Sequence, residues 1–228
     1  MKVNRTAVVT DSGNGLGRTF ANILLKNRYN VILAATQDSF DNLSVETDDL
    51  HKYKLVKTDF TSDKSVSELR ETIVHTFGHL DLLLNNAEVA NGFGQKIEQI
   101  DIEEVKALYD MNVFGVMRLI KTLKPLLEKS EEPKIINITS ALGDLNKMMD
   151  ESFCYSNYCM MAYASSKAAL NMYTHLQGKE FSPSKISIKN FDPVALKNCT
   201  HNSVSICEGV KEEFISLINS KSLNPDHH

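Results

Sequence analysis

The sequence has no tryptophan, no excess of basic residues and no long apolar run. Its formal charge is −4 and its pI about 6.0, which argues against a nucleic-acid partner, and no lysine/arginine cluster favours membrane headgroups. No apolar stretch approaches the ~18–20 residues that span a bilayer, and the start, MKVNRTAVVT, lacks the pattern of a signal peptide. We therefore expect a cytoplasmic protein that binds neither nucleic acid nor membrane.

Cysteine is also scarce. The four cysteines, Cys154, Cys159, Cys199 and Cys207, form no CxxC pair and no zinc-ligand spacing. We expect reduced thiols and no metal site.

Short runs rich in Val, Ile and Leu alternate with helix-like segments about six times along the 228 residues. The runs lack polar alternation, which is typical of parallel strands that are buried on both faces. With no repeat and no linker-like segment, the pattern predicts one α/β domain over residues 1–228, a doubly wound parallel sheet with helices on both faces. The expected strands are 6–10, 30–36, a third ending near 59, 80–87, 134–140 and 186–193, and the expected helices include 20–25, 65–78, 102–127, 161–181 and 210–220.

Ligands of such sheets bind at the carboxyl ends of the strands. The segments that follow the strands should therefore line one crevice, and they begin after Thr10, Thr36, Asp59, Asn86, Ser140 and Pro193.

A glycine-rich turn, TDSGNGLG, joins the first expected strand to the first helix. The free N–H groups and the dipole of a helix start attract phosphate. Gly15 and Gly17 would let a ligand approach the backbone. Taken alone, such a turn is as often an ordinary loop.

The stretch YASSK places Tyr163 and Lys167 four residues apart, on one face of a helix. A lysine beside a phenol lowers the phenol pKa. Without further context, such a pair is more often a solvated surface pair.

Six motifs in this order resemble the short-chain dehydrogenase/reductase family, in the carbonyl-reductase-like branch with the C-factor and Sniffer types. The resemblance covers nearly the whole chain and implies a Rossmann fold with strand order 3-2-1-4-5-6. The matching residues are Thr10 with Gly15 and Gly17, Asp59, Asn85–Ala87, Asn112, Ser140, and Tyr163 with Lys167.

The resemblance implies an NAD(P)-dependent oxidoreductase that reduces a small aldehyde, ketone or quinone by hydride transfer. Tyr163 would donate the proton, Lys167 would lower the Tyr163 pKa and hold the nicotinamide ribose, Ser140 would bind the substrate oxygen, and Asn112 would hold a water. NADP(H) is favoured over NAD(H), and a homodimer or homotetramer is expected. The expected cofactor-binding residues are Ser12, Asn14, Gly15, Leu16, Gly17, Thr36, Asp59, Phe60, Asn86, Ala87, Tyr163, Lys167 and Pro193.

Three glycines of the family pattern are absent, and Asp11, Glu88 and Val194 stand in their places. Left-handed backbone is cheap for Gly, tolerable for Asp and poor for Val. The two carboxylates should also repel phosphate and weaken cofactor binding. These losses favour an alternative function, a non-catalytic scaffold that binds a protein or small ligand without turnover.

Two further departures concern segments of the chain. Tyr163 follows Ser140 by 23 residues, so residues 141–162 should contain an inserted loop before the catalytic helix. Residues 194–210 are expected to form the substrate-loop region. No β-rich segment follows the last helix, so the seventh strand of the family should be missing.

Overall fold

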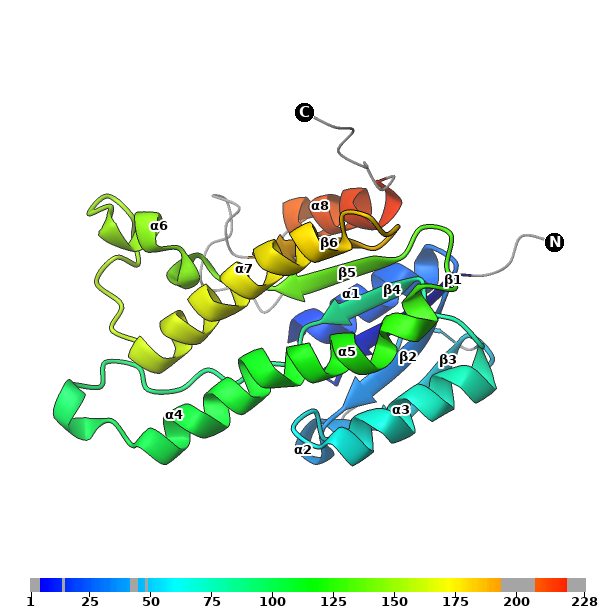
Figure 1. Cartoon of the computed structure of the whole chain (residues 1–228), viewed down its shortest axis with the longest axis horizontal. Helices are drawn as coiled ribbons and strands as arrows, with labels where there is room; N and C mark the ends of the chain where they lie inside the picture. The colour runs from blue at the N-terminus through cyan, green and yellow to red at the C-terminus, as the bar shows by residue number, and fades with distance from the viewer. Residues whose placement is uncertain (1–4, 14, 42–44, 48, 194–207, 221–228) are drawn as a thin grey trace.

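The computed structural model describes residues 5–13, 15–41, 45–47, 49–193 and 208–220. Six parallel strands form one sheet in the order β3-β2-β1-β4-β5-β6, which confirms the predicted topology (Figure 1). The strands are β1 (Arg5–Thr10), β2 (Tyr29–Ala35), β3 (Tyr53–Lys57), β4 (Leu82–Asn85), β5 (Lys134–Ile138) and β6 (Ser187–Phe191).

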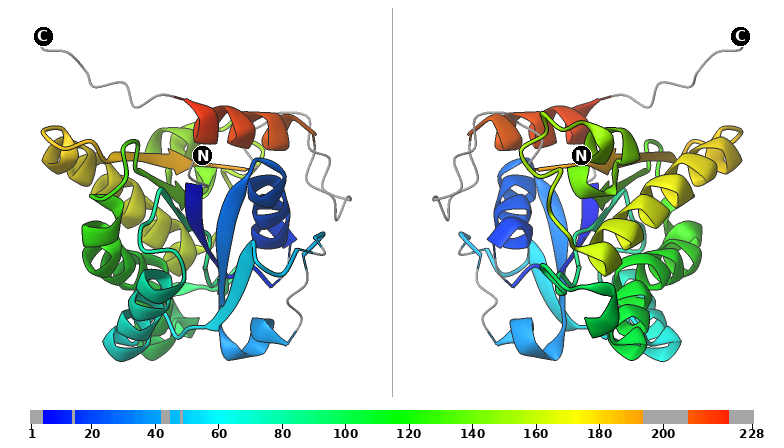
Figure 2. Two further views of the ribbon diagram at one scale, coloured as in Figure 1. Left: turned by 90° about the vertical axis from the view of Figure 1, so that its right-hand side faces the viewer. Right: turned by 90° about the vertical axis from the view of Figure 1, so that its left-hand side faces the viewer.

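Helices cover both faces of the sheet (Figure 2). Helices α1 and α8 lie on one face, and α3, α5 and α7 lie on the other. The helices are α1 (Gly15–Lys26), α2 (Gln37–Phe40), α3 (Asp63–Thr76), α4 (Ile102–Tyr109), α5 (Val116–Leu127), α6 (Leu145–Met149), α7 (Met161–Phe181) and α8 (Glu208–Asn219). Among the described residues no helix is both long and apolar enough to span a membrane.

Apolar side chains alternate between the two faces of each strand, which gives the sheet a core on either side. Val8 and Ile32 pack against α3, α5 and α7, whereas Val9 and Leu33 pack against α1 and α8. The second core contains Phe20 of α1, whose ring centroid lies 4.4 Å from that of Phe214 in α8. Both faces of the strands are therefore dry, as the absence of polar alternation predicted.

The structure corrects several expected element boundaries. The single helix expected over 102–127 is divided by a π-helical turn, Asp110–Gly115, that separates α4 from α5. The fourth and sixth strands are shorter than expected, and two short helices, α2 and α6, were not predicted at all. A helix of four or five residues offers too little periodicity to be read from a pattern.

Two segments, 141–162 and 194–210, are expected to form loops. Residues 141–162 contain a 3₁₀ turn, Ala141–Gly143, and α6 before α7 begins, so the segment is partly helical. Of residues 194–210, only the start of α8 lies within the described part of the chain, and Val194 lies outside it. Within the described ranges β6 is an edge strand and no seventh strand is present.

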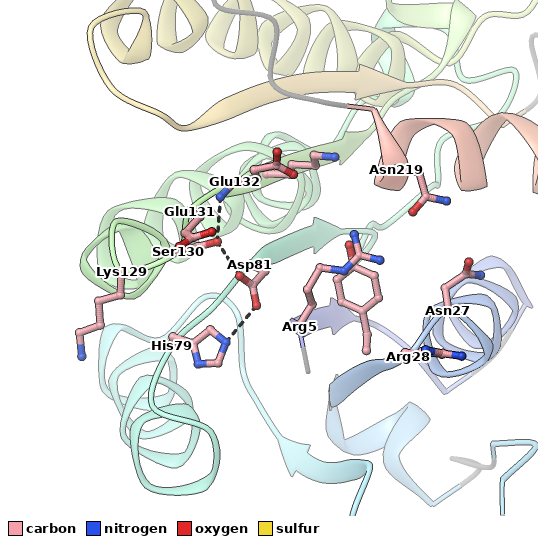
Figure 3. Close-up of a pocket in the computed structure, with 12 residues that line it drawn as sticks. Arg5, Asn27, Arg28, His79, Asp81, Lys129, Ser130, Glu131, Glu132 and Asn219 are labelled. Atoms are coloured by element: carbon pink, nitrogen blue, oxygen red, sulfur yellow. Dashed lines mark hydrogen bonds and ion pairs between the residues drawn. The ribbon is translucent and has the colours of Figure 1, made fainter. Parts of the chain in front are cut away.

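Asp81 ties the amino-terminal ends of β1 and β4 to the segment before β5. Its Oδ2 accepts a hydrogen bond from the Thr6 amide at 2.6 Å and lies 3.1 Å from His79 Nε2. Its Oδ1 accepts a hydrogen bond from Ser130 Oγ at 2.5 Å (Figure 3). One largely buried carboxylate therefore fixes the start of three elements.

We predict that Asp81→Ala lowers the free energy of unfolding by about 2–3 kcal/mol, because the Thr6 amide and the Ser130 hydroxyl lose a charged partner. Urea denaturation measures the loss. The exposed carboxylate of Glu131 provides the control, and Glu131→Ala should change stability by less than about 0.5 kcal/mol. Equal effects of the two substitutions would contradict the assigned role of Asp81.

Candidate active site

Tyr163 and Lys167 lie on the inner face of α7 at the carboxyl edge of the sheet. Their exposed fractions are 7% and 2%, so they are not a solvated surface pair. The Lys167 ammonium donates a hydrogen bond to the Ile138 carbonyl, at the end of β5, at 3.0 Å. Its Nζ lies 5.6 Å from the centroid of the Tyr163 ring. The two side chains therefore form one buried unit beneath the ends of the strands.

Glu88 joins this unit from the segment that follows β4. Its Oε2 lies 2.5 Å from Lys167 Nζ, and it accepts a hydrogen bond from the Tyr163 hydroxyl at 3.2 Å. A single carboxylate oxygen thus contacts both groups. The sequence identified Glu88 only as a missing glycine, although a lysine buried on a helix requires an anionic partner, and this requirement could have drawn attention to Glu88.

The pKa of Tyr163 is raised well above its ordinary value of 10.0. Burial of the phenol is the largest cause, the negative charge of Glu88 and its hydrogen bond raise the pKa further, and a hydrogen bond with Ser140 acts in the opposite direction. In the free protein the shift is therefore opposite to the predicted lowering. The phenol stays protonated throughout the neutral range and can act as a proton donor.

Ser140 lies two residues beyond β5 and caps the 3₁₀ turn that follows, where its Oγ accepts a hydrogen bond from the Leu142 amide at 3.2 Å. This turn packs directly on α7. A Cβ at Gly143 would lie 2.6 Å from the Lys167 carbonyl carbon, so only glycine lets the turn approach the helix backbone. Gly143 therefore keeps Ser140 beside Tyr163, a role that the sequence analysis missed.

Asn112 is fully buried in the π-helical turn. Its Oδ1 accepts a hydrogen bond from the Val89 amide at 2.8 Å, and its Nδ2 donates to the Val89 carbonyl at 2.9 Å and to Ser166 Oγ at 3.2 Å. The side chain therefore fixes the residue next to Glu88. A water held at this point stays a prediction.

Comparison with known proteins identifies the family of this chain. The family model described as short chain dehydrogenase matches residues 5–208. The chain belongs to the short-chain dehydrogenase family.

The chain is similar to several curated oxidoreductases, and two of those described here have names that state a reaction. Diacetyl reductase [(S)-acetoin forming] of Staphylococcus epidermidis is 27% identical over 96% of this chain and 79% of its own length. The NADPH-dependent pterin aldehyde reductase of Arabidopsis thaliana is 30% identical over 68% of this chain and 64% of its own length. An uncharacterized oxidoreductase of Saccharomyces cerevisiae is 32% identical over 70% of this chain and 50% of its own length.

Solved structures share the fold. A protein described as a carbonyl reductase, Sniffer of Caenorhabditis elegans, superposes with a TM-score of 0.75 at 23% identity, over 95% of this chain and 91% of that one. The complex of RhlG with NADP from Pseudomonas aeruginosa has a TM-score of 0.68 at 26% identity, over 84% of this chain and 73% of that one.

In this short-chain dehydrogenase two of the described positions of the glycine-rich turn have a left-handed backbone. Asp11 adopts a left-handed φ of 49°, a conformation that Asp tolerates, and Gly15 has a φ of 51°. A Cβ at Gly15 would meet no atom within 4 Å, so the turn is open on that side. At Gly17 a Cβ would lie 2.2 Å from the Asp11 carbonyl oxygen, so Gly17 serves the packing of the turn itself.

Thr10 connects this turn to the segment after β4. Its Oγ1 accepts hydrogen bonds from the amides of Asn86 and Ala87 at 2.8 and 2.9 Å. The Asn86 side chain donates in return to the carbonyls of Thr10 and Asp11 at 3.1 and 3.2 Å. The turn and the residues before Glu88 therefore form one hydrogen-bonded block.

The other expected cofactor residues lie at the same edge, as the ends of parallel strands must. Thr36 precedes α2, and Asp59 is exposed, with its Oδ1 accepting hydrogen bonds from the amide and hydroxyl of Thr61. Asn14 lies outside the described residues, so its assignment stays a prediction. Ser12, Phe60 and Pro193 are buried and Leu16 is half-buried.

A cleft of about 1090 Å³ opens at the opposite, amino-terminal end of the strands (Figure 3). Arg5, Asp81 and Lys134 lie at or beside the strand starts and line it together with charges of both signs. None of the expected site residues lines this cleft. We place the candidate active site at the carboxyl edge, because Ser140, Tyr163 and Lys167 converge there.

We predict that Asn112→Ala lowers the free energy of unfolding by about 2–3 kcal/mol, because both backbone groups of Val89 lose their partner. Urea denaturation measures the change. Asn146→Ala, at an exposed position of α6, is the control and should be close to neutral. A neutral Asn112→Ala would show that Val89 needs no support from the π-helical turn.

Proposed function

We propose that this chain is an NAD(P)-dependent oxidoreductase that reduces a small aldehyde, ketone or quinone. The observation that carries the proposal is the buried pair of Tyr163 and Lys167 beside Ser140 at the carboxyl edge of the sheet. The names of two relatives, diacetyl reductase and pterin aldehyde reductase, support a carbonyl substrate.

The residues present fit a dinucleotide on the side of the glycine-rich turn. The turn is open at Gly15, and the 12-residue helix α1 directs its first amides toward that side. Lys167 would hold the nicotinamide ribose once its present contact with Glu88 is released. The bound cofactor supplies the hydride that the protein's own side chains cannot supply.

The protein's own residues then act on the substrate oxygen. The Ser140 hydroxyl donates a hydrogen bond to the carbonyl oxygen as negative charge develops there. The Tyr163 hydroxyl gives its proton to the same oxygen and completes the alcohol. The phenolate that remains is stabilised by the Lys167 ammonium on the same face of α7. A water beside Asn112 would return the proton.

NADP(H) is our proposed cofactor. Thr36 and Gln37 follow β2, and neither side chain is a carboxylate, so neither repels a 2′-phosphate. The NADPH-dependent pterin aldehyde reductase and the NADP complex of RhlG support this preference. The carboxylate of Asp11 acts against it.

We also propose a homodimer, or a tetramer built from it, through α4, α5 and α7. Helix α7 is apolar on both faces: Leu170 packs on the sheet, whereas Met172 and Leu176 are 60% and 53% exposed. Phe114, in the turn between α4 and α5, is also exposed. Helices α4 and α7 pack side by side (Figure 1). We propose that a second copy of the chain covers these exposed apolar side chains.

Catalysis depends on Tyr163 in this proposal. Tyr163→Phe should lower kcat/KM for carbonyl reduction by about 10²–10⁴-fold, because the proton donor is lost while the ring keeps its packing. Steady-state kinetics on a panel of aldehydes, ketones and quinones measures the loss. Tyr173→Phe, on the same helix, is the matched control and should keep most activity.

Titration with NADPH and NADH, followed by nicotinamide fluorescence, tests whether the protein binds a dinucleotide at all. A dissociation constant in the micromolar range supports the reductase. If neither nucleotide binds at millimolar concentration, the reductase proposal fails and the non-catalytic scaffold becomes the better account.

Assembly depends on the exposed apolar side chains of α7 in this proposal. Met172→Glu should convert the oligomer to monomers, because burying a carboxylate in an apolar interface is costly. Light scattering after size-exclusion chromatography measures the mass. Val74→Glu, at an exposed apolar position on α3, should leave the mass unchanged. A monomeric wild type would rule out the proposed dimer.

A further inference from the structure

The geometry points to Glu88 as an internal occupant of the site where the nicotinamide ribose would bind. We propose that the Glu88 carboxylate takes the place of that ligand in the free protein and must be displaced when the dinucleotide binds. The inference rests on the proposed function, in which Lys167 and Tyr163 serve cofactor and substrate. Its basis is that Glu88 Oε2 contacts both of these side chains.

The first argument is the charge of Lys167. The side chain is 2% exposed, and an ammonium buried to this degree needs an anion or a shift to its neutral form. Among the described residues, Glu88 is the one carboxylate in ion-pair contact with Lys167. A side chain of the protein therefore meets a demand that a bound ligand would otherwise meet.

The second argument is that the backbone around Glu88 is fixed. Asn86 and Ala87 are bonded to Thr10 on one side, and Val89 is bonded to Asn112 on the other. Within the described residues, the contacts of Glu88 itself are those of its side chain, which is one-third exposed. Displacement therefore needs a rotation of one side chain toward solvent and no movement of the segment.

The Glu88 side chain does not strain the backbone. Among the described residues the non-glycine positions with a positive φ are Asp11 and Arg28, and Glu88 is not one of them. The position does not require glycine for its conformation. What the side chain changes is the space and the charge next to Lys167 and Tyr163.

The proposal makes a quantitative statement about binding. Glu88→Gln and Glu88→Gly should each lower the dissociation constant for NADPH at least 10-fold, because neither variant has an ion pair to break. Glu88→Asp keeps the charge on a shorter side chain and should give an intermediate value. Equilibrium titration by nicotinamide fluorescence measures all four proteins, and Glu71→Gln, an exposed carboxylate of α3, is the matched control.

The Glu88→Gln and Glu88→Gly variants, which should bind NADPH more tightly, should be less stable than the wild type when no nucleotide is bound. Loss of the Glu88 carboxylate leaves Lys167 with the Ile138 carbonyl but no counter-charge, so the Tm without nucleotide should fall by roughly 3–6 °C. The rise in Tm at saturating NADPH should be larger in Glu88→Gln than in the wild type. A residue with a purely structural role would lower the Tm without improving binding.

The outcomes separate the inference from the proposed function. Tighter binding in the variants supports both. If the wild type binds NADPH and the Glu88 variants bind no more tightly, the inference is wrong and the reductase proposal stands. If the wild type binds neither nucleotide at millimolar concentration, both are wrong. Should Glu88→Gln fail to fold, Glu88→Asp retains a carboxylate and the binding comparison remains decisive.

Discussion

The buried ammonium of Lys167 is the constraint on which the site depends. A positive charge taken out of water must be paired and hydrogen-bonded. The protein supplies the pairing from two neighbouring strands, through the Ile138 carbonyl at the end of β5 and the Glu88 carboxylate after β4. The ends of β4 and β5, helix α7 and the phenol of Tyr163 are therefore connected through one charged group.

The short segment after β4 transmits this constraint to the rest of the crevice. Through Asn86 it is bonded to Thr10 and the glycine-rich turn, and through Val89 it is bonded to Asn112. Asn112 needs the π-helical turn, because a regular helix over 102–127 would place its side chain differently relative to Val89. The expected cofactor side and the catalytic side of the site are thus one hydrogen-bonded unit.

Much of the fold could be predicted from the sequence because it depends on local pattern. Strands buried on both faces are continuous apolar runs, and the strand order follows from the family resemblance. The π-helical turn, α2 and α6 could not be predicted, since each is shorter than the window of about 11–18 residues in which a helical period can be recognised. The roles of the site residues, the limits of the inserted loop, the homodimer and the cytoplasmic location stay predictions.

The sequence predicted that the candidate site residues lie at one edge of the sheet, but not the direction of the Tyr163 pKa shift. The order of the motifs places Ser140, Tyr163 and Lys167 at one edge, because parallel strands end there. The rise in the Tyr163 pKa depends first on the burial of the phenol and then on Glu88, 75 residues earlier in the chain. No spacing rule contains that contact, whereas the requirement of a buried lysine for an anion does lead to it.

Asp11 and Glu88, which replace two glycines of the family pattern, have different effects on the site. Asp11 has a left-handed backbone, which Asp tolerates, and its carboxylate adds a negative charge to the turn. Glu88 occupies a position with ordinary backbone and alters what Lys167 and Tyr163 contact. Asp11 therefore changes the charge of the turn, whereas the contact of Glu88 can be released by the rotation of one side chain. The absence of glycine at these two positions is therefore compatible with a working dinucleotide site, with Glu88 as the group that a nucleotide must displace.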